Sequence, residues 1–334
     1  MRVSFDEMYS EIKRVFMKYG MEEERAALCA RIHTESNRDG IFSHGTNRVE
    51  RFVDYIKKGW VNPNAQPVVE KDLGAIRILN GNMGPGISNA ITAVEMGMEL
   101  AKRNGIGMVG LRNTTHWMRG GSYGLYAANK GFAAILWTNT ESCMPPWGGK
   151  TCTIGNNPFI MALPCEPDAV VLDMAMSQYA YGKLEVTRQA GKRLPFPGGF
   201  NTKGELTDIP GEIEESRRIL PMGYWKGSSF AVMLDILGAA LTGGIGAADI
   251  DRKNMGSCAG ASQVFIIIDP SQIIDYNTMV EITKKEINHI KSAELAENAK
   301  SILAPGEDYV NFRKDHDRNG IFVDDEVWKT ILAL

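Results

Sequence analysis

The middle of the sequence alternates short apolar runs with longer amphipathic stretches, and this alternation limits the possible folds more than any other feature. Apolar runs bounded by turn residues are typical of buried strands, whereas apolar residues three and four positions apart indicate helices. Helices are expected over about 87–103 and 123–129. Strands are expected over 75–79, 107–112, 133–138, 160–163, 170–174 and 264–268. The pattern predicts an α/β core built on one buried sheet.

Both ends of the chain have the helical pattern instead. Ser4 is a plausible N-cap and Gly20 a plausible stop for a first helix. Helices are also expected over about 22–37, 47–58, 278–292, 310–318 and 324–332. The Pro/Asn-rich stretch 61–67 reads as a linker, and 194–211, with three prolines and four glycines, reads as a long irregular loop. The fold class is therefore mixed α+β. A helical lobe of 1–73 plus about 277–334 would flank an α/β domain over 74–276.

Composition removes several classes of function. A formal net charge of −3 creates no field that would attract nucleic acid or an anionic membrane. No run of about 18 apolar residues is present to cross a membrane, and the N-terminal stretch has helical rather than signal-peptide character. Five cysteines without CxxC spacing make a disulfide framework or a zinc site improbable. A cytoplasmic protein without nucleic-acid or membrane partners is expected.

The string Gly105-Ile-Gly107-Met-Val-Gly110 matches the GxGxxG dinucleotide fingerprint, but its context is wrong. That fingerprint must follow a strand and open a helix, so that the pyrophosphate meets the helix N-terminus. Here the glycines follow a predicted helix and lead into a predicted strand. Gly105 is better explained as a left-handed helix cap. Any dinucleotide site in this chain is expected to be of a non-Rossmann type.

The segment Ser43-His44-Gly45, followed by Arg48, has the chemistry that reduction of a 2-keto acid needs. A histidine titrates near neutral pH and can protonate a developing alkoxide. An arginine four residues later lies on the same face of a helix and can hold a carboxylate through two hydrogen bonds. An equally supported alternative is that Ser43 serves only as a helix cap and that His44 lies on the protein surface.

A second His/Arg pair, His116 and Arg119, follows the predicted strand 107–112 and precedes Gly120-Gly121. Active-site groups in α/β folds lie at the carboxyl ends of strands, which favours a substrate or cofactor loop. The alternative is a packed Trp117 beside a solvated arginine. The other three histidines (His33, His289 and His316) lie on charged predicted helices and are expected at the surface. No cluster has metal-ligand spacing, so no metal is predicted.

Three further segments suit a pocket for a flat heterocycle or a structural turn equally well. The strings 144–148 and 221–227 are aromatic and glycine-rich, and Lys226 would lie near the start of a helix that runs to about 241. The apolar run 170–174 contains Asp173, whose carboxylate suits either a ribose hydroxyl or a helix cap.

Taken together, these segments resemble the type 2 malate/L-lactate dehydrogenase family, a non-Rossmann group of nicotinamide enzymes. The resemblance extends over essentially the whole chain. It rests on Ser43-His44-Gly45 with Arg48, 106–109, 113–116, Thr138-Asn139, 154–158 and Asp173-Met174. Within the family, 116–124, 144–148 and 221–227 look most like the members that reduce a diketo sugar acid.

That resemblance implies NADH-dependent reduction of 2,3-diketo-L-gulonate to 3-dehydro-L-gulonate by a cytoplasmic homodimer. It makes His44 the proton donor, with His116 a competing acid/base, and it is compatible with Ser43, Arg48 and Arg119 as substrate-binding residues. The carboxylates of Glu307 and Asp308 would disfavour a 2′-phosphate, and so NADP. The implied cofactor-binding residues are Asn139, Ala169, Val170, Val171, Leu172, Asp173, Met174, Ala175, Trp225, Lys226, Gly306, Glu307 and Asp308.

Two alternatives remain open on sequence. An enzyme of the same family could act on malate, lactate, ureidoglycolate or a cyclic imino acid, because loop positions rather than motifs decide between substrates that differ by a hydroxyl. A non-catalytic protein that binds a small molecule is the second alternative, and the two His/Arg pairs argue against it.

Overall fold

The computed structural model describes residues 1–334, and its central feature is a seven-stranded sheet. Neighbouring strands β3 and β4 are parallel, and every other pair in the sheet is antiparallel. In spatial order the strands are β2 (Val68–Asp72), β3 (Ile76–Asn80), β4 (Ile106–Thr114), β13 (Ala261–Ile268), β5 (Ala133–Thr138), β8 (Phe159–Leu163) and β9 (Val170–Met174). The predicted buried sheet and the mixed α/β class are confirmed.

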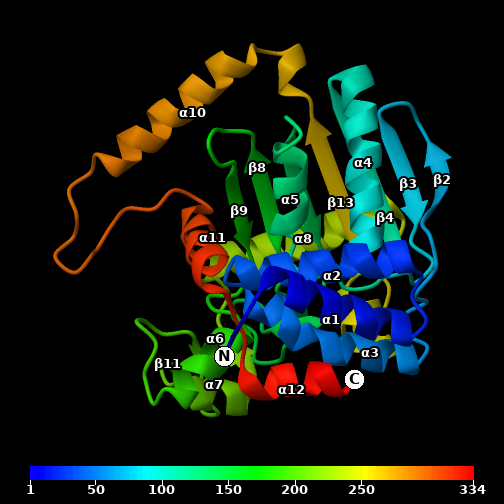
Figure 1. The fold of residues 1–334 in the computed structure, drawn as a ribbon. Helices are drawn as coiled ribbons and strands as arrows, with labels where there is room; N and C mark the ends of the chain where they lie inside the picture. The colour runs from blue at the N-terminus through cyan, green and yellow to red at the C-terminus, as the bar shows by residue number, and fades with distance from the viewer.

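Helices cover both faces of this sheet (Figure 1). On one face lie α4 (Gly86–Asn104) and α5 (Gly121–Ala128), and on the other lies α8 (Trp225–Thr242). The core beneath α4 and α5 contains Leu79, Val109, Leu136 and Phe265, all with no exposed surface. The alternating pattern therefore marks strands that are buried between helices, as expected for apolar runs of this kind.

A helical layer lies across one end of the sheet and is assembled from both ends of the chain (Figure 1). It contains α1 (Phe5–Lys18), α2 (Glu23–Arg38), α3 (Val49–Lys57) and α12 (Asp325–Ala333). Phe16, Phe52 and Trp328 share its core. The short strand β1 (Arg2–Val3) pairs with β14 (Ile321–Phe322), which joins the two ends directly.

The expected linker over 61–67 contains no helix or strand. The boundary expected at residue 73 differs from the structure, because β2 lies within the range assigned to the helical lobe. It is instead the antiparallel partner of β3 at the edge of the large sheet. All five of its residues are exposed, so it lacks the apolar pattern that identified the other strands. Separate domains remain a prediction, with the boundary moved to before β2.

The stretch 194–211, expected to be irregular, contains regular structure. Strand β10 (Gly199–Phe200) pairs with both β11 (Leu206–Thr207) and β12 (Arg218–Ile219) in a small antiparallel sheet. This sheet lies beside α6 (Tyr181–Gln189) and α7 (Pro210–Ser216), around the buried side chains of Leu184 and Ile213. Near it, β6 (Ser142–Met144) pairs with β7 (Ile154–Gly155). Strands of two or three residues are too short to leave a periodic signal.

The remaining elements lead to and from the sheet. Helix α9 (Ala247–Lys253) and the short helix η3 (Gly256–Cys258) precede β13, and η4 (Pro270–Gln272) follows it. Helix α10 (Tyr276–Lys291) then extends away from the body like an arm before the chain returns to α11 (Glu307–Asn319) (Figure 1). Within α10 only Met279 and Val280 are buried.

By length and composition no single helix could cross a membrane, although α8 and α9 together pass that test as a bent pair.

The structure excludes phosphate binding by a Rossmann-type turn at Gly105. Gly105 has φ +79° and caps the C-terminus of α4, with its N–H donating to Ala101 O at 2.7 Å. This is the left-handed position that glycine favours. Gly107 and Gly110 lie inside β4.

Candidate active site

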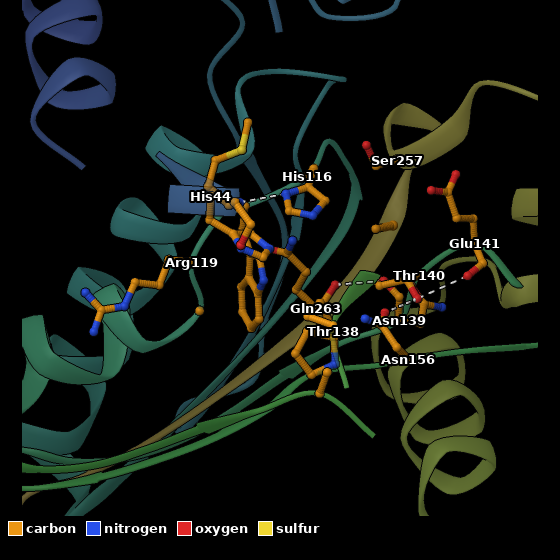
Figure 2. A pocket seen from close by; sticks show the side chains of 18 of the residues that line it. His44, His116, Arg119, Thr138, Asn139, Thr140, Glu141, Asn156, Ser257 and Gln263 are labelled. Atoms are coloured by element: carbon orange, nitrogen blue, oxygen red, sulfur yellow. Dashed lines mark hydrogen bonds between the residues drawn. The ribbon is translucent and has the colours of Figure 1, made fainter. Parts of the chain in front are cut away.

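The main cavity, of about 260 Å³, lies where the helical layer meets the carboxyl ends of β4 and β5. Four structural units contribute to its wall: the short helix η1 (Phe42–His44), the loop between β4 and α5, the segment after β5, and η3. Figure 2 shows His44 and His116 side by side, with Arg119 on one side of them and Glu141 and Ser257 on the other. Tyr309 on α11 also lines the cavity, so residues from both ends and from the middle of the chain meet in one pocket.

His44 is the last residue of η1 and lines the main cavity. Its Nδ1 lies 2.9 Å from Ser43 Oγ. A hydroxyl can donate to this nitrogen or accept from it. The Ser43 hydroxyl therefore suits both protonation states of the ring, which is what a group that gains and loses a proton requires.

His116 is held in one tautomer. The backbone N–H of Met118 donates to His116 Nδ1 at 2.8 Å, so Nδ1 is an acceptor and the neutral ring carries its proton on Nε2. Met118 has φ +62°, a left-handed conformation that is uncommon for a side chain of this kind and tends to occur at functional sites. Gly86 lies against this loop, and a Cβ there would be 2.3 Å from His116 O.

The two imidazoles stack, with centroids 5.7 Å apart and planes inclined by 27°. Burial is the main cause that lowers the pKa of His44 to about 3, and the cations Arg48 and Arg119 add to it. Burial likewise lowers the pKa of His116 well below its usual value, and Arg48 and His44 add to it. Both rings are therefore neutral at pH 7 before any anionic ligand binds.

The two arginines expected to bind substrate differ in what they contact. Arg48 donates from Nε to Ser43 O at 3.1 Å and forms no salt bridge, which leaves its terminal nitrogens available. It lines a small cavity that adjoins the main one and also borders His116. Arg119 lies at the wall of the main cavity but is only 4% exposed, and its Nη1 donates to Asp39 Oδ2 at 2.5 Å.

Asp39 is the centre of a buried ionic network. It accepts hydrogen bonds from Arg119 and, at 2.9 Å, from both Nε and Nη2 of Arg313 on α11. Burial alone would raise the pKa of this carboxyl, but the two guanidinium groups outweigh it and hold the pKa below its usual range. Arg119 also lies 4.7 Å from the ring centroid of Tyr309. The network ties α11 to the loop that carries His116.

Two of the expected cofactor-binding side chains are engaged in structural contacts. Asp173 lines the main cavity, but its Oδ2 accepts the N–H of Gly121 at 2.8 Å at the start of α5. Burial raises the pKa of this carboxyl. Asn139 also lines the cavity, yet its amide nitrogen donates to Asp235 and to Ile245 O, and its amide oxygen accepts from Ser262 N. The helix-cap interpretation of Asp173 is therefore the one that the geometry favours.

Two further expected cofactor segments, 169–175 and 306–308, meet at a second cavity, of about 40 Å³, which shares Arg119 and Tyr309 with the first. Ala169, Val171 and Gly306 line it. The strand β9 supplies Val170, Leu172 and Met174, and Ala175 beyond it reaches the main cavity. At the start of α11, Glu307 pairs with Lys291 Nζ at 2.6 Å, whereas Asp308 is exposed. The segments around 169–175 and 306–308 therefore lie together, as an extended ligand that enters the main cavity requires.

Trp225 and Lys226 are not brought to either cavity. They form the first turn of α8, where Trp225 is largely exposed. The neighbouring string 144–148 packs against this turn, with Trp147 N donating to Ser228 Oγ at 2.8 Å and the rings of Trp147 and Tyr224 in edge-to-face contact. In a single chain these two aromatic segments are structural neighbours of each other and do not line the pocket.

Several residues of the main cavity had no signal in the sequence. Glu141 and Ser257 line it, and so does Tyr309, which faces both cavities. Asn156 also lines it, and the sequence marked it only as part of the segment 154–158. Gln263 is fully buried at the wall, and both its amide atoms lack a hydrogen-bond partner. These residues come from loops and strand ends that are far apart in sequence, so no spacing rule could have grouped them.

Two histidines expected at the surface are buried, which corrects that expectation. His33 has no exposed surface, and its Nδ1 lies 2.9 Å from Gly45 O, directly behind His44. Burial lowers the pKa of His33 to about 4. His316 contacts Arg38 O through Nδ1 at 2.7 Å. No group of three or more histidine, cysteine or acidic side chains is placed to hold a metal ion.

The sequence and the fold match known proteins along their whole length. The model of the malate/L-lactate dehydrogenase family matches residues 3–332. The chain is 43% identical to a 2,3-diketo-L-gulonate reductase of Escherichia coli O127:H6 and 42% identical to that of strain K12, each over 334 residues and 100% of both chains.

Solved structures give the same result. The malate dehydrogenase of Pyrococcus horikoshii OT3 superposes with a TM-score of 0.90 at 28% identity, over 99% of this chain and 93% of that one. The sulfolactate dehydrogenase of Methanocaldococcus jannaschii gives 0.88 at 27% identity, over 99% and 95%. These relatives are dehydrogenases and reductases that act on hydroxy and keto acids. The chain is a nicotinamide-dependent oxidoreductase of this kind and belongs to the malate/L-lactate dehydrogenase family.

Proposed function

We propose that this enzyme reduces 2,3-diketo-L-gulonate to 3-dehydro-L-gulonate with NADH. The observation that carries the proposal is the stacked pair of His44 and His116 at the cavity wall, with the unpaired Arg48 beside it. These groups provide a proton, a hydrogen-bond donor and a cation for a carboxylate. The full-length identity to 2,3-diketo-L-gulonate reductases supports this substrate over others of the family.

In this proposal His44 is the proton donor. The nicotinamide, when bound, supplies a hydride to the C2 carbonyl carbon. His44 gives its proton to the carbonyl oxygen, and the Ser43 hydroxyl at Nδ1 reorients as the ring changes charge. An anionic substrate favours the protonated ring, because an opposite charge nearby stabilises the charged form.

His116 has a different role, because its tautomer is fixed. With Nδ1 occupied by the Met118 N–H, it presents Nε2–H as a neutral donor to the carbonyl oxygen. A second proton on Nδ1 would face the N–H of Met118, so the cationic form is disfavoured. His116 thus orients and polarises the carbonyl, and the two histidines no longer compete for one role.

Arg48 is the proposed partner of the substrate carboxylate. Its terminal nitrogens are free and can form two parallel hydrogen bonds to a carboxylate. Arg119 is a less suitable partner, because a substrate would have to displace Asp39 from it. We therefore assign Arg119 to the ionic network at the wall, with Ser43 and Arg48 nearest to the substrate.

We propose NADH as the cofactor, held along the cavity shared by β9 and α11. The fit rests on the continuous lining by 169–175, Gly306 and Tyr309, which leads into the main cavity. The exposed carboxylate of Asp308, next to Glu307, would repel a 2′-phosphate, which disfavours NADPH.

We further propose that the protein is a cytoplasmic homodimer whose subunits meet through α8. This helix exposes a row of apolar side chains, which monomeric soluble proteins seldom do. The exposed residues are Trp225, Phe230, Met233, Ile236, Leu237 and Leu241. The row begins at Trp225 and Lys226, so an interface here also accounts for the position of these two residues outside the cavities. Light scattering should show a dimer, and Met233→Glu should give a folded monomer.

A panel of 2-keto acids tested with NADH and with NADPH examines the main proposal. We expect the highest kcat/KM with 2,3-diketo-L-gulonate and NADH. A higher value with oxaloacetate would instead indicate a malate dehydrogenase, and a higher value with pyruvate would indicate a lactate dehydrogenase. Absence of turnover throughout, with no NADH-dependent thermal shift, would favour a non-catalytic binding protein.

A further inference from the structure

One end of the main cavity is lined by four polar side chains that the proposed reaction does not use. Thr140 and Glu141 follow β5, Asn156 follows β7, and Ser257 lies in η3. Figure 2 shows them grouped on the side of the histidine pair that is opposite to Arg119. Arg119 borders the cavity lined by the proposed cofactor segments, so this polar end faces the part of a substrate that points away from them.

The polar end has unused hydrogen-bonding capacity. Thr140 Oγ1 donates to Asn156 Oδ1 at 3.1 Å, which leaves the Asn156 amide nitrogen as a donor without a partner. The Ser257 hydroxyl has no side-chain partner either. Glu141 forms no salt bridge and accepts no hydrogen bond on its carboxylate. The site therefore offers one anionic acceptor beside donors and hydroxyls.

Glu141 also lies close to the backbone that frames the pocket. A Cβ on Gly256 would lie 3.3 Å from Glu141 Oε2 and 3.5 Å from the Tyr55 hydroxyl. Burial raises the pKa of this carboxyl, and Arg48 and Arg51 oppose that effect. The carboxylate is thus part of the cavity wall near the cations, yet it is not paired with them.

We propose that Glu141 is a specificity-determining residue that selects substrates by the far end of their carbon chain. Resting on the function proposed above, the inference is that this carboxylate accepts hydrogen bonds from the hydroxyl groups of a polyhydroxy 2-keto acid. The same carboxylate repels the second carboxylate of a dicarboxylic 2-keto acid.

The selectivity follows from the sign of one charge. Hydrogen bonds from hydroxyls to an ionised carboxylate are stronger than bonds between neutral groups. Two like charges placed together inside a cavity are disfavoured, and this is a common way to exclude a wrong ligand. A short substrate such as pyruvate does not extend to Glu141, so neither effect applies to it. Polyhydroxy 2-keto acids should therefore have the highest kcat/KM. Dicarboxylic 2-keto acids should have a lower kcat/KM than their size alone would suggest.

The variant Glu141→Gln tests this, because it keeps the shape of the side chain and removes the charge. Steady-state kinetics with NADH would compare 2,3-diketo-L-gulonate, oxaloacetate and pyruvate. Glu24→Gln is the matched control, since Glu24 is exposed on α2 and outside the pocket. Because Glu141 is in part exposed to solvent, which screens its charge, we expect the ratio of kcat/KM for the hydroxylated substrate to that for oxaloacetate to fall by about 5- to 10-fold in Glu141→Gln. Values for pyruvate, and all values in the control, should change less than about threefold.

The possible results distinguish a wrong role for Glu141 from a wrong substrate for the enzyme. If the wild-type enzyme is active but Glu141→Gln leaves the ratio unchanged, Glu141 does not read the substrate and this inference alone is wrong. A lower melting temperature with an unchanged ratio would make Glu141 a structural counter-ion of Arg48 and Arg51. If the wild-type enzyme reduces none of the three acids, the proposed function fails and the inference fails with it.

Discussion

The ring of His44 stacks on the ring of His116 at 5.7 Å, yet the two histidines have different partners at Nδ1. His44 faces the Ser43 hydroxyl, and His116 faces the N–H of Met118. The first partner permits a change of charge and the second opposes it. Two chemically identical side chains are thus prepared for two different tasks, a division that their spacing in the sequence could not reveal.

Replacing His44 with Ala should lower kcat by about 10²- to 10⁴-fold, the usual contribution of a positioned acid. The affinity for NADH, measured by fluorescence titration, should remain within about threefold of wild type. His289→Ala, on the exposed end of α10, is the matched control. Normal turnover in the His44 variant would transfer the role of acid to His116.

Replacing His116 should give a different pattern, because only a donor at the Nε2 position is needed. His116→Gln places an amide N–H near that position, whereas His116→Leu places none there. We expect kcat of the Gln variant to exceed that of the Leu variant by about tenfold, the loss expected for one hydrogen bond. At His44, Gln should be no better than Ala, since an amide cannot supply a proton. Equal activities of the two His116 variants would contradict the neutral-donor role.

Arg48 and Arg119 should separate into a binding and a structural residue. Arg48→Met should raise KM for the keto acid at least about 30-fold, since loss of one member of a buried charge pair costs about 2–5 kcal/mol. Its melting temperature should change little. Arg119→Met should instead lower the free energy of unfolding by about 3–5 kcal/mol, because it leaves Asp39 short of a buried partner. Chemical denaturation and steady-state kinetics on both variants check that Arg48→Met changes mainly KM and that Arg119→Met changes mainly the free energy of unfolding.

Acid should destabilise the fold below about pH 6.5 through His33. The unfolded chain binds a proton at this residue near pH 6.5, whereas burial lowers the pKa of the folded form to about 4. Stability from the neutral ring is therefore complete above pH 6.5 and is lost as the pH falls toward 4. The loss amounts to roughly 3 kcal/mol over this range. His33→Phe should make the dependence of unfolding free energy on pH less steep without abolishing it, because the buried rings of His44 and His116 also have lowered pKa values.

The sequence predicted the elements with strong periodicity and missed those that depend on distant contacts. The strand over 133–138 was predicted with its exact bounds, because all its residues are apolar apart from Thr138. The edge strand β2 was missed because Glu70, Lys71 and Asp72 give it the composition of a loop. Only its pairing with β3 makes it a strand.

The candidate site was predictable in part for the same reason. His44, His116 and Arg48 have local patterns that suggest chemistry, and the structure brings them together. His33 was expected at the surface because α2 carries many polar residues, but α1 and α3 cover it with Phe16 and Phe52. Glu141 lies in a loop with no motif, and its position in the cavity depends on η3, more than 100 residues later.

The pairing of the two chain ends has a consequence for how the enzyme is made. Asn37 accepts the N–H of Thr46 at 2.7 Å, which fixes the segment after His44, and it donates to Phe322 O at 3.3 Å. These last two partners are 285 residues apart. At ribosomal speeds of about 5–20 residues per second, roughly 15 to 60 seconds pass between the synthesis of α2 and that of β14. Until then the support behind His44 is incomplete, so the nascent chain is expected to be inactive until its last strand emerges.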